Sequence, residues 1–502
     1  MSDYRREAGV LCHISSLPGK YGIGSLGKAA YRFAEKLAKC GVGYWQILPL
    51  VQTGYGDSPY SSVACNSGNP YFIDLETLQK QKLLTSAELK GAEVAAGNVD
   101  YGMLYATRYP LLRRAFSRFN LDGEGFRAFV KQGEYEDYAL YMTAKTVYGD
   151  GFSAWPEQIR RRDPAALESL RTSHHEEYLF WQFLQYEFRR QWNRLRDYAN
   201  GLGVSIIGDI PLYVAADSAD VWAHPQLFRL NEDLSPKKVA GVPPDYFCAT
   251  GQLWGNPVYD WEGHKEACIA WWRRRLLSAL DTYNIVRIDH FRGLDRYYEV
   301  DAGAENAIAG TWQDGPKKEL FASFSEEERR RIIAEDLGDY DESVQQLLRT
   351  MGFPGMKILL FAFDGNPDNT YLPSNIGENC VIYTGTHDNS TVAGYLSSLS
   401  AEEYILFKSR VAAEMEHAGL SLPLNESPKS FCTALIALAL CSKARLAVIP
   451  VQDLLCANDA SRMNRPGILG DNWMFRLEKF PPRRVMKLLK KAVTAFGRKH
   501  NV

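Results

Sequence analysis

Carboxylates follow short apolar segments at four places in the sequence. They are Asp209 in Gly-Asp-Ile-Pro, Asp289 in Arg-Ile-Asp-His, Glu335 in Ala-Glu-Asp-Leu-Gly and Asp388 in Thr-His-Asp-Asn. Short apolar runs rich in β-branched residues predict buried strands, so each acid is expected at the end of a strand. One such acid could simply cap the next helix. Several acids in equivalent positions indicate a site, because unpaired buried charge is costly.

A basic residue lies close to the second of these acids. Arg287 is two residues before Asp289, and His290 follows it. Side chains two apart on a strand point to the same face, so Arg287 is expected beside Asp289. A cation at that position should keep Asp289 ionised at neutral pH, as a nucleophile requires.

Two kinds of chemistry suit such a cluster. A carboxylate pair ~5 Å apart can cleave a glycosidic bond with retention, one acid as nucleophile and the other as general acid with a raised pKa. Spacing does not choose between Glu335 and Asp336, which point to opposite faces. The alternative is a metal-dependent hydrolase with His and Asp ligands. It would want an H-x-H pair on the first strand, where the chain has only His13-Ile14-Ser15, so this alternative ranks lower.

The elements that must position these acids alternate along the chain. Strands are expected near residues 11, 47, 206, 287, 333, 359, 382 and 448, mostly separated by helical segments. This alternation favours an α/β fold, a closed (β/α)8 TIM barrel, with the site at the C-terminal ends of the strands. An open doubly wound sheet is the alternative. It would want a glycine fingerprint after the first strand, which is missing.

The chain of 502 residues is interpreted as a single catalytic barrel, residues 1–502, with two insertions. Residues 65–172 lose the alternating pattern and predict an inserted, mainly helical subdomain. Residues 215–262 are rich in loops and prolines, and they predict a second, loop-rich insertion over the active site. The polar loop at residues 52–62 is too long and too aromatic to be only a connector.

Composition limits the partners. The formal net charge is -2, so there is no electrostatic case for nucleic acid or an anionic membrane. We expect no membrane-spanning segment and no secretory signal. The nine cysteines form no C-x-x-C pair, which suggests a reducing cytoplasm and no zinc framework. Aromatic residues make up 12% of the chain, a stock that suits stacking against sugar rings.

The carboxylate motifs resemble those of the α-amylase superfamily, and further motifs narrow the resemblance. These are Gly-Tyr55-Gly-Asp-Ser-Pro-Tyr60, Gly-Asp209-Ile-Pro-Leu-Tyr213-Val, Pro-Pro-Asp245-Tyr246-Phe247, Gly-Gln252-Leu-Trp254-Gly-Asn-Pro and Arg462-Met-Asn464-Arg-Pro-Gly. From His13 to Trp473 the chain resembles the 4-α-glucanotransferases, also called amylomaltases or disproportionating enzymes, of glycoside hydrolase family 77. One departure is His224 before Pro225, where the family would have asparagine.

The resemblance implies roles for the acids. Asp289 would be the nucleophile, Glu335 the general acid/base, and Asp388 a third carboxylate that holds sugar hydroxyls at the donor subsite. The residues implied to bind substrate are Tyr55, Asp209, Tyr246, Phe247, Gln252, Trp254, Arg287, His290, His387 and Asn464.

The resemblance also implies an activity. The enzyme would transfer α-1,4-glucan segments between maltooligosaccharides, amylose, starch or glycogen-derived glucans, through a covalent glucosyl-enzyme. No cofactor, metal or C-terminal β-domain is expected. An α-glucan hydrolase that uses the same acids is the alternative, because only the acceptor differs.

Overall fold

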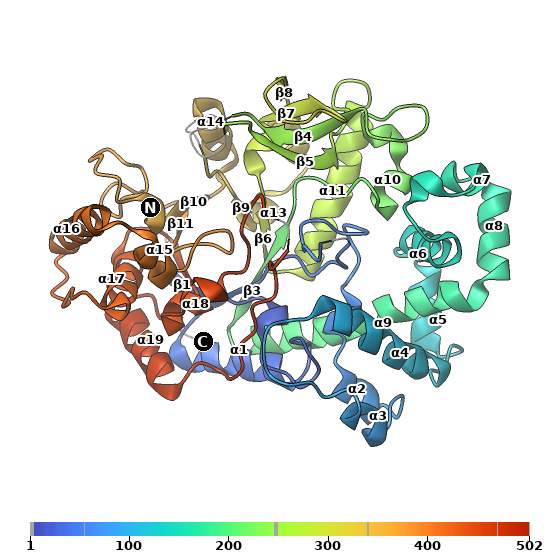
Figure 1. Cartoon of the computed structure of the whole chain (residues 1–502), viewed down its shortest axis with the longest axis horizontal. Helices are drawn as coiled ribbons and strands as arrows, with labels where there is room; N and C mark the ends of the chain where they lie inside the picture. The colour runs from blue at the N-terminus through green and yellow to red at the C-terminus, as the bar shows by residue number, and fades with distance from the viewer. Residues whose placement is uncertain (1–4, 55, 245–248, 339–340, 469, 501–502) are drawn as a thin grey trace.

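Eight parallel strands form one sheet in the computed structural model, which describes residues 5–54, 56–244, 249–338, 341–468 and 470–500. The sheet order is β10-β11-β12-β1-β2-β3-β6-β9. The strands are β1 (Glu7–Leu11), β2 (Tyr44–Gln46), β3 (Ser205–Ile210), β6 (Ile285–Ile288), β9 (Ile332–Ala334), β10 (Gly355–Ile358), β11 (Cys380–Tyr383) and β12 (Leu446–Pro450). All eight expected strands are present, and the predicted barrel is confirmed (Figure 1).

The ring closes between β9 and β10 without a regular ladder. The Ala334 N–H donates to the Pro354 carbonyl at 3.0 Å. The Asp336 carboxylate accepts the Met356 N–H at 2.7 Å. A Cβ at Gly355 would lie 2.6 Å from that carboxylate, so only glycine lets Asp336 approach this closely. A side chain therefore substitutes for ladder hydrogen bonds at this joint.

The barrel strands are buried because helices cover their outer faces. Every residue of β12 is buried, as are all residues of β11 and β9, which is usual for parallel strands between helices. The helices of the barrel and of the C-terminal half are α1 (Lys28–Cys40), α9 (His175–Gly201), α11 (Lys265–Thr282), α12 (Lys318–Phe321), α13 (Glu326–Arg330), α14 (Glu342–Met351), α15 (Val392–Ser398), α16 (Ala401–His417), α17 (Pro428–Cys441), α18 (Val451–Leu455) and α19 (Arg483–Ala495).

One strand is shorter than the sequence predicts. A strand is expected near residue 359, but β10 ends at Ile358 and η6 (Leu359–Phe361) follows. Leu359 and Leu360 are buried in this 3-10 turn. Their hydrophobicity reflects core packing rather than strand pairing, and an apolar run alone does not distinguish the two.

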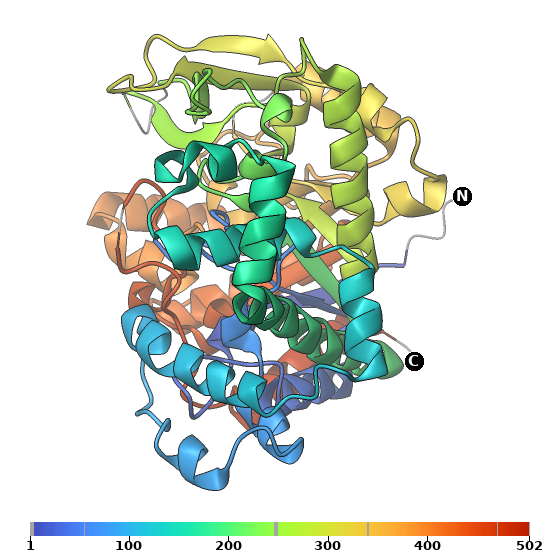
Figure 2. The same ribbon diagram turned by 90° about the vertical axis from the view of Figure 1, so that its right-hand side faces the viewer.

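The segment at residues 65–172 is helical and lies to one side of the barrel. Figure 1 shows most of it at the right, and Figure 2 turns it toward the viewer. Its helices are α2 (Leu75–Lys80), α3 (Ser86–Lys90), α4 (Tyr101–Ser117), α5 (Glu124–Lys131), α6 (Glu136–Tyr148), α7 (Glu157–Arg160) and α8 (Pro164–Ser173). Helix α9, which leads into β3, packs against α4, α5, α6 and α8 and so connects this segment to the barrel.

A second sheet lies beside the barrel mouth and was not foreseen from the sequence. Its four antiparallel strands have the order β5-β4-β7-β8. They are β4 (Lys238–Val242), β5 (Gln252–Pro257), β7 (Arg296–Asp301) and β8 (Thr311–Asp314), and α10 (Ala219–Ala223) precedes them. A small core of Val239, Tyr298, Val300 and Ala307 supports the sheet. Among the described residues, no helix is long and apolar enough to cross a membrane.

Candidate active site

Asp209 and Arg287 face each other across neighbouring barrel strands. They are register partners in the pairing of β3 with β6. Nη1 of Arg287 lies 2.8 and 2.7 Å from the two Asp209 carboxylate oxygens, and 3.0 Å from Oδ1 of Asp289. Arg287 is 3% exposed and Asp209 1%. The predicted contact between Arg287 and Asp289 is confirmed, and the same guanidinium also binds a second acid.

Asp289 and Glu335 directly follow the last paired residues of β6 and β9, where Ile288 is the register partner of Ala334. The Glu335 N–H donates to the Ile288 carbonyl at 3.0 Å. His290 has a left-handed backbone, with φ of 48°, and its N–H donates to Oε2 of Glu335 at 2.6 Å. This turn therefore holds the carboxyl of Glu335 against the chain that carries Asp289.

Glu335 and Asp336 separate as adjacent strand residues should. Oε1 of Glu335 accepts the Leu337 N–H at 3.1 Å, so both oxygens of this carboxyl are hydrogen-bonded to main-chain N–H groups. Asp336 instead accepts hydrogen bonds from Met356 and from Gln345 of α14, at 2.7 and 3.0 Å. Of these two acids, Glu335 belongs to the cluster with Asp289 and Asp336 does not, a choice that residue spacing alone could not make.

The pKa of Asp289 is raised well above its usual value. Loss of water around the carboxylate is the main cause; Arg287 opposes the shift, and Asp209, Glu335 and Asp388 add to it. Arg287 therefore favours the ionised form of Asp289, as expected, although the same guanidinium is shared with Asp209. That Asp289 is ionised at neutral pH stays a prediction.

The pKa of Glu335 is also raised. Burial is the main cause, while Arg287 and the N–H groups of His290 and Leu337 oppose it. Two neighbouring carboxyls with raised pKa values titrate as a pair. Glu335 is among the carboxylates that raise the pKa of Asp289, so protonation of one acid affects the other.

Asp388 lies on the opposite side of the mouth, on the loop after β11. Its Oδ1 accepts a hydrogen bond from Nδ2 of Asn464 at 2.7 Å, and its Oδ2 lies 3.3 Å from Nε2 of His387. Burial lowers the pKa of His387, although Asp388 acts in the other direction. The Asn464 N–H also donates to the His387 carbonyl at 3.0 Å. Two chain segments therefore meet at this third acid.

Tyr60 connects the two sides. Its hydroxyl donates to Oδ2 of Asp209 at 2.7 Å. Its ring is stacked on His387, with centroids 5.0 Å apart and an interplanar angle of 10°. Tyr60 was part of a motif quoted above but was not assigned to the site. The signal that could have found it was its place in a loop too aromatic for a simple connector.

Trp254 and Gln252 reach the site from β5. The Trp254 ring meets the His290 ring edge-on, with centroids 4.7 Å apart and an angle of 84°. Its indole Nε1 donates to Oε1 of Gln252 at 3.3 Å. Trp254 is 36% exposed, which is high for a tryptophan, so part of its ring is free to meet a ligand.

Ten of the thirteen predicted site residues thus form one connected cluster. The other three, Tyr55, Tyr246 and Phe247, lie outside the described residues.

Arg462 was not assigned to the site although its motif was recognised. It donates from Nη2 to the main-chain carbonyl of Asp388 and from Nη1 to Oγ of Ser390 at 3.1 Å.

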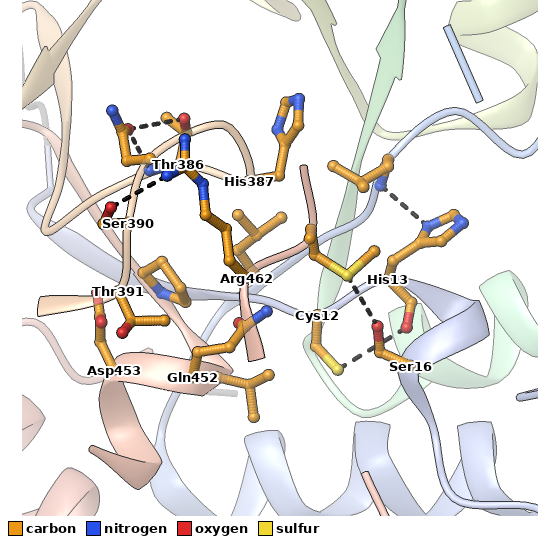
Figure 3. A pocket seen from close by; sticks show the side chains of 16 residues that line it. Cys12, His13, Ser16, Thr386, His387, Ser390, Thr391, Gln452, Asp453 and Arg462 are labelled. Carbon is orange, nitrogen blue, oxygen red and sulfur yellow. Dashed lines mark hydrogen bonds between the residues drawn. The ribbon is translucent and has the colours of Figure 1, made fainter. Parts of the chain in front are cut away.

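A pocket adjoins Asp388, between the ends of β1, β11 and β12. His13, His387 and Asp453 are among its walls (Figure 3). Neither Asp289 nor Glu335 lines it, so it is a neighbour of the acid cluster rather than its centre. In the part of the chain that the structure describes, no group of three His, Cys, Asp or Glu residues could hold a metal ion.

Fold and site together are those of a (β/α)8-barrel enzyme that uses carboxylates. A sequence model described as 4-alpha-glucanotransferase, Glyco_hydro_77, matches residues 12–481. The 4-alpha-glucanotransferase of Clostridium butyricum is 43% identical over 472 residues, which cover 92% of this chain and 95% of that protein. The enzyme of Thermus thermophilus with the same name is 42% identical over 483 residues, or 94% and 95% of the two chains.

A solved structure agrees with these relatives. The amylomaltase from Streptococcus agalactiae, in complex with acarbose, has a TM-score of 0.91 and 35% identity, and the match covers 99% of this chain and 100% of that one. The chain belongs to the 4-alpha-glucanotransferase family, glycoside hydrolase family 77.

Proposed function

We propose that this protein is a 4-α-glucanotransferase that moves α-1,4-glucan segments between maltooligosaccharides, with amylose, starch or glycogen-derived glucans as further donors and acceptors. One observation carries the mechanism. Asp289 and Glu335 lie at the ends of adjacent strands, with Arg287 bonded to Asp289 and the His290 N–H bonded to Glu335. This arrangement gives two neighbouring acids different partners, which a nucleophile and a general acid require.

In the first step Asp289 attacks the anomeric carbon while Glu335 protonates the departing glycosidic oxygen. The raised pKa of Glu335 supports its role as acid. Of the two ways to place one proton on the pair, direct contact with Arg287 favours the one with Asp289 ionised. The products of this step are a glucosyl ester on Asp289 and a shortened glucan.

In the second step Glu335 removes a proton from the 4-hydroxyl of an acceptor glucan. That oxygen attacks the anomeric carbon, and the Asp289 carboxylate leaves. Asp388 would hold sugar hydroxyls at the donor subsite, with Asn464 and His387 fixing its two oxygens. These steps need only side chains of the chain itself.

Transfer rather than hydrolysis requires that a sugar outcompete water. A thousandfold preference needs only ~4 kcal/mol of barrier difference. Within the proposed insertion at residues 215–262, Trp254 contacts His290 and is hydrogen-bonded to Gln252, and the two side chains would orient the acceptor and reduce access of water. Tyr55, Asp209, Tyr246 and Phe247 complete the proposed glucan-binding set, and residues 65–172 are the proposed helical subdomain.

Incubation with maltotriose tests the proposal. Glucose and a ladder of longer maltooligosaccharides, with a constant number of reducing ends, is the expected result. A rise in reducing ends with only shorter products would make water the acceptor and the enzyme a hydrolase.

The eight cysteines among the described residues are free, which supports a cytoplasmic location as part of the same proposal.

A further inference from the structure

A buried carboxylate without a role so far lies at the barrel mouth. Asp453 belongs to α18, directly after β12, and is 2% exposed. Burial raises its pKa to about 6, and no cation among the described residues acts on it to offset this. A buried acid without a cationic partner costs stability unless its hydrogen bonds recover the loss. The hydrogen-bond partners of Asp453 therefore indicate its role.

Asp453 binds both ends of the loop that carries Asp388. We call residues 385–391 the Asp388 loop. Just before it, the Thr384 hydroxyl donates to Oδ2 of Asp453. Just after it, the N–H of Val392, the first residue of α15, donates to Oδ1 at 2.9 Å. One carboxylate from α18, the helix after β12, therefore fixes the point where the loop leaves β11 and the point where it enters α15.

The same chain segment contacts the interior of the Asp388 loop. Asp459 accepts the Thr391 N–H at 3.3 Å. Arg462 donates to the Asp388 carbonyl and the Ser390 hydroxyl. Figure 3 shows Asp453 beside Thr391 on one side of the pocket, with Arg462 reaching across toward Ser390. The chain segment after β12 thus contacts the Asp388 loop along its length, and Asp453 provides the contacts at the two ends of the loop.

We propose that Asp453 is a positioning residue for Asp388. Its carboxylate is bonded to Thr384 and Val392, and in this way it holds the Asp388 loop so that Asp388 meets Asn464 and His387 in one fixed geometry. The inference rests on the proposed function, because the role of Asp388 at the donor subsite belongs to that proposal. A displacement of ~1 Å at a substrate-orienting group can cost ~100-fold in rate.

The chain offers a matched control. Glu414 of α16 is also buried, at 8% exposure. It likewise braces a loop through one N–H and one hydroxyl, both from Ser374, at 2.7 and 3.2 Å. It makes no contact with the acid cluster described above. Glu414→Leu therefore measures how the loss of a buried carboxylate that is hydrogen-bonded to a loop affects the stability of the fold, apart from any effect on the site.

The first test measures maltotriose transfer by Asp453→Leu, Asp453→Asn and Glu414→Leu. We expect Asp453→Leu to lower kcat at least tenfold with KM changed less than threefold. Asp453→Asn keeps an acceptor for Val392, and its amide can donate to the Thr384 hydroxyl, so kcat should return to within threefold of the parent. Glu414→Leu should keep kcat even where its melting temperature falls. Equal kcat in Asp453→Leu and Glu414→Leu would overturn the inference.

A binding cycle tests whether Asp453 acts through Asp388. The probe is acarbose, the ligand of the Streptococcus agalactiae relative, and its affinity is measured by calorimetry. Asp453→Leu should weaken binding several-fold in the parent and less than twofold in Asp388→Asn, because the two effects are not additive when one residue works through the other. Equal weakening in both backgrounds would overturn the inference.

Two further outcomes remain distinct. If Asp453→Leu does not fold, Thr384→Val removes one of the two bonds at nearly constant shape. It should lower kcat about threefold or more, and an unchanged kcat would contradict the proposal. If the unsubstituted protein redistributes no maltotriose, the proposed function fails, and with it the premise of this inference. Normal transfer by Asp453→Leu would overturn the positioning role alone.

Discussion

The two sides of the barrel mouth hold their acids by different means. On the side of β3, β6 and β9, Asp209 and Asp289 share the buried cation Arg287. On the side of β11 and β12, Asp388 is bonded to the neutral amide of Asn464. We call these the charged side and the neutral side. The charged side adjusts proton affinities, whereas the neutral side fixes positions.

The difference follows from what each side must do in the proposed mechanism. Charge changes on Asp289 and Glu335 during the proposed reaction, so a neighbouring cation is useful there. Asp388 would only hold sugar hydroxyls in this mechanism, so its surroundings must fix its position. On that side burial lowers the pKa values of His13 and His387.

The largest expected effect comes from substituting Asp289 or Glu335 on the charged side. Asp289→Asn and Glu335→Gln should each lower the rate of maltotriose transfer by ~1000-fold or more, because the first removes the nucleophile and the second the acid/base. Acarbose binding should remain measurable by calorimetry. Rates within tenfold of the parent in either variant would refute the assigned roles.

Substitution of Arg287 separates its charge from its shape. Arg287→Lys keeps a cation but loses the planar fork, and we expect kcat to fall ~10–100-fold. Arg287→Met removes the charge, which favours the protonated forms of Asp289 and Glu335. The acid limb of the kcat/KM profile should therefore move to higher pH. A limb that stays in place would contradict this account.

Folding must be checked in the same two variants. A buried acid left without its partner costs ~3–5 kcal/mol, and Asp209 would lose its cation in Arg287→Met. Circular dichroism and thermal unfolding would show whether the lost activity reflects the site or the fold.

On the neutral side, His13 is expected to make the free energy of unfolding depend on pH. His13 is 5% exposed, and burial lowers its pKa to about 3. An unfolded histidine takes up a proton near pH ~6.5, so as pH falls below that value the unfolded state gains a proton that the folded state refuses. His13 should therefore cost the native state up to ~1.4 kcal/mol per pH unit between its unfolded and folded pKa values.

His13→Gln is the matching variant, because its amide oxygen can still accept the Leu48 N–H that bonds to Nδ1 of His13 at 3.2 Å. Denaturant unfolding at pH 7 and pH 5 should show that the variant loses about 1–2 kcal/mol less stability than the parent. Parallel losses would show that His13 is protonated in the folded state.

The smallest expected effect lies outside both sides. Trp254→Ala removes an exposed ring that touches His290 but bonds to no acid. We expect the KM for the acceptor glucan to rise several-fold and the share of hydrolysis to increase, with thermal stability nearly unchanged. Product analysis with maltotriose measures both quantities. An unchanged ratio of transfer to hydrolysis would remove Trp254 from the acceptor site.

The barrel could be predicted because most of its strands are largely apolar. Every residue of β9, β11 and β12 is buried, so these strands appear in the sequence as hydrophobic runs. The antiparallel sheet was missed because only part of each strand is buried. In β5, three consecutive residues of six are exposed, and β8 has no buried residue.

The charge balance of the site could not be predicted from one strand. Arg287 was read as the partner of Asp289 because the two are neighbours in sequence. Asp209 lies 78 positions away and becomes the register partner of Arg287 only when β3 and β6 pair. The same holds for Asp453, whose bonds to Thr384 and Val392 depend on the approach of two loops.

The joint between β9 and β10 has a consequence for heat inactivation. The other neighbours in the ring share regular ladders, such as the five register pairs between β1 and β12, but this joint depends on one main-chain bond and on Asp336. We expect amide hydrogens at residues 332–334 and 355–358 to exchange with deuterated solvent before those of β1 and β12. Glu335 lies at this joint and Asp289 does not. An enzyme warmed toward its melting point should therefore lose its proton donor while most of the ring, including the strand that leads to its nucleophile, is still folded.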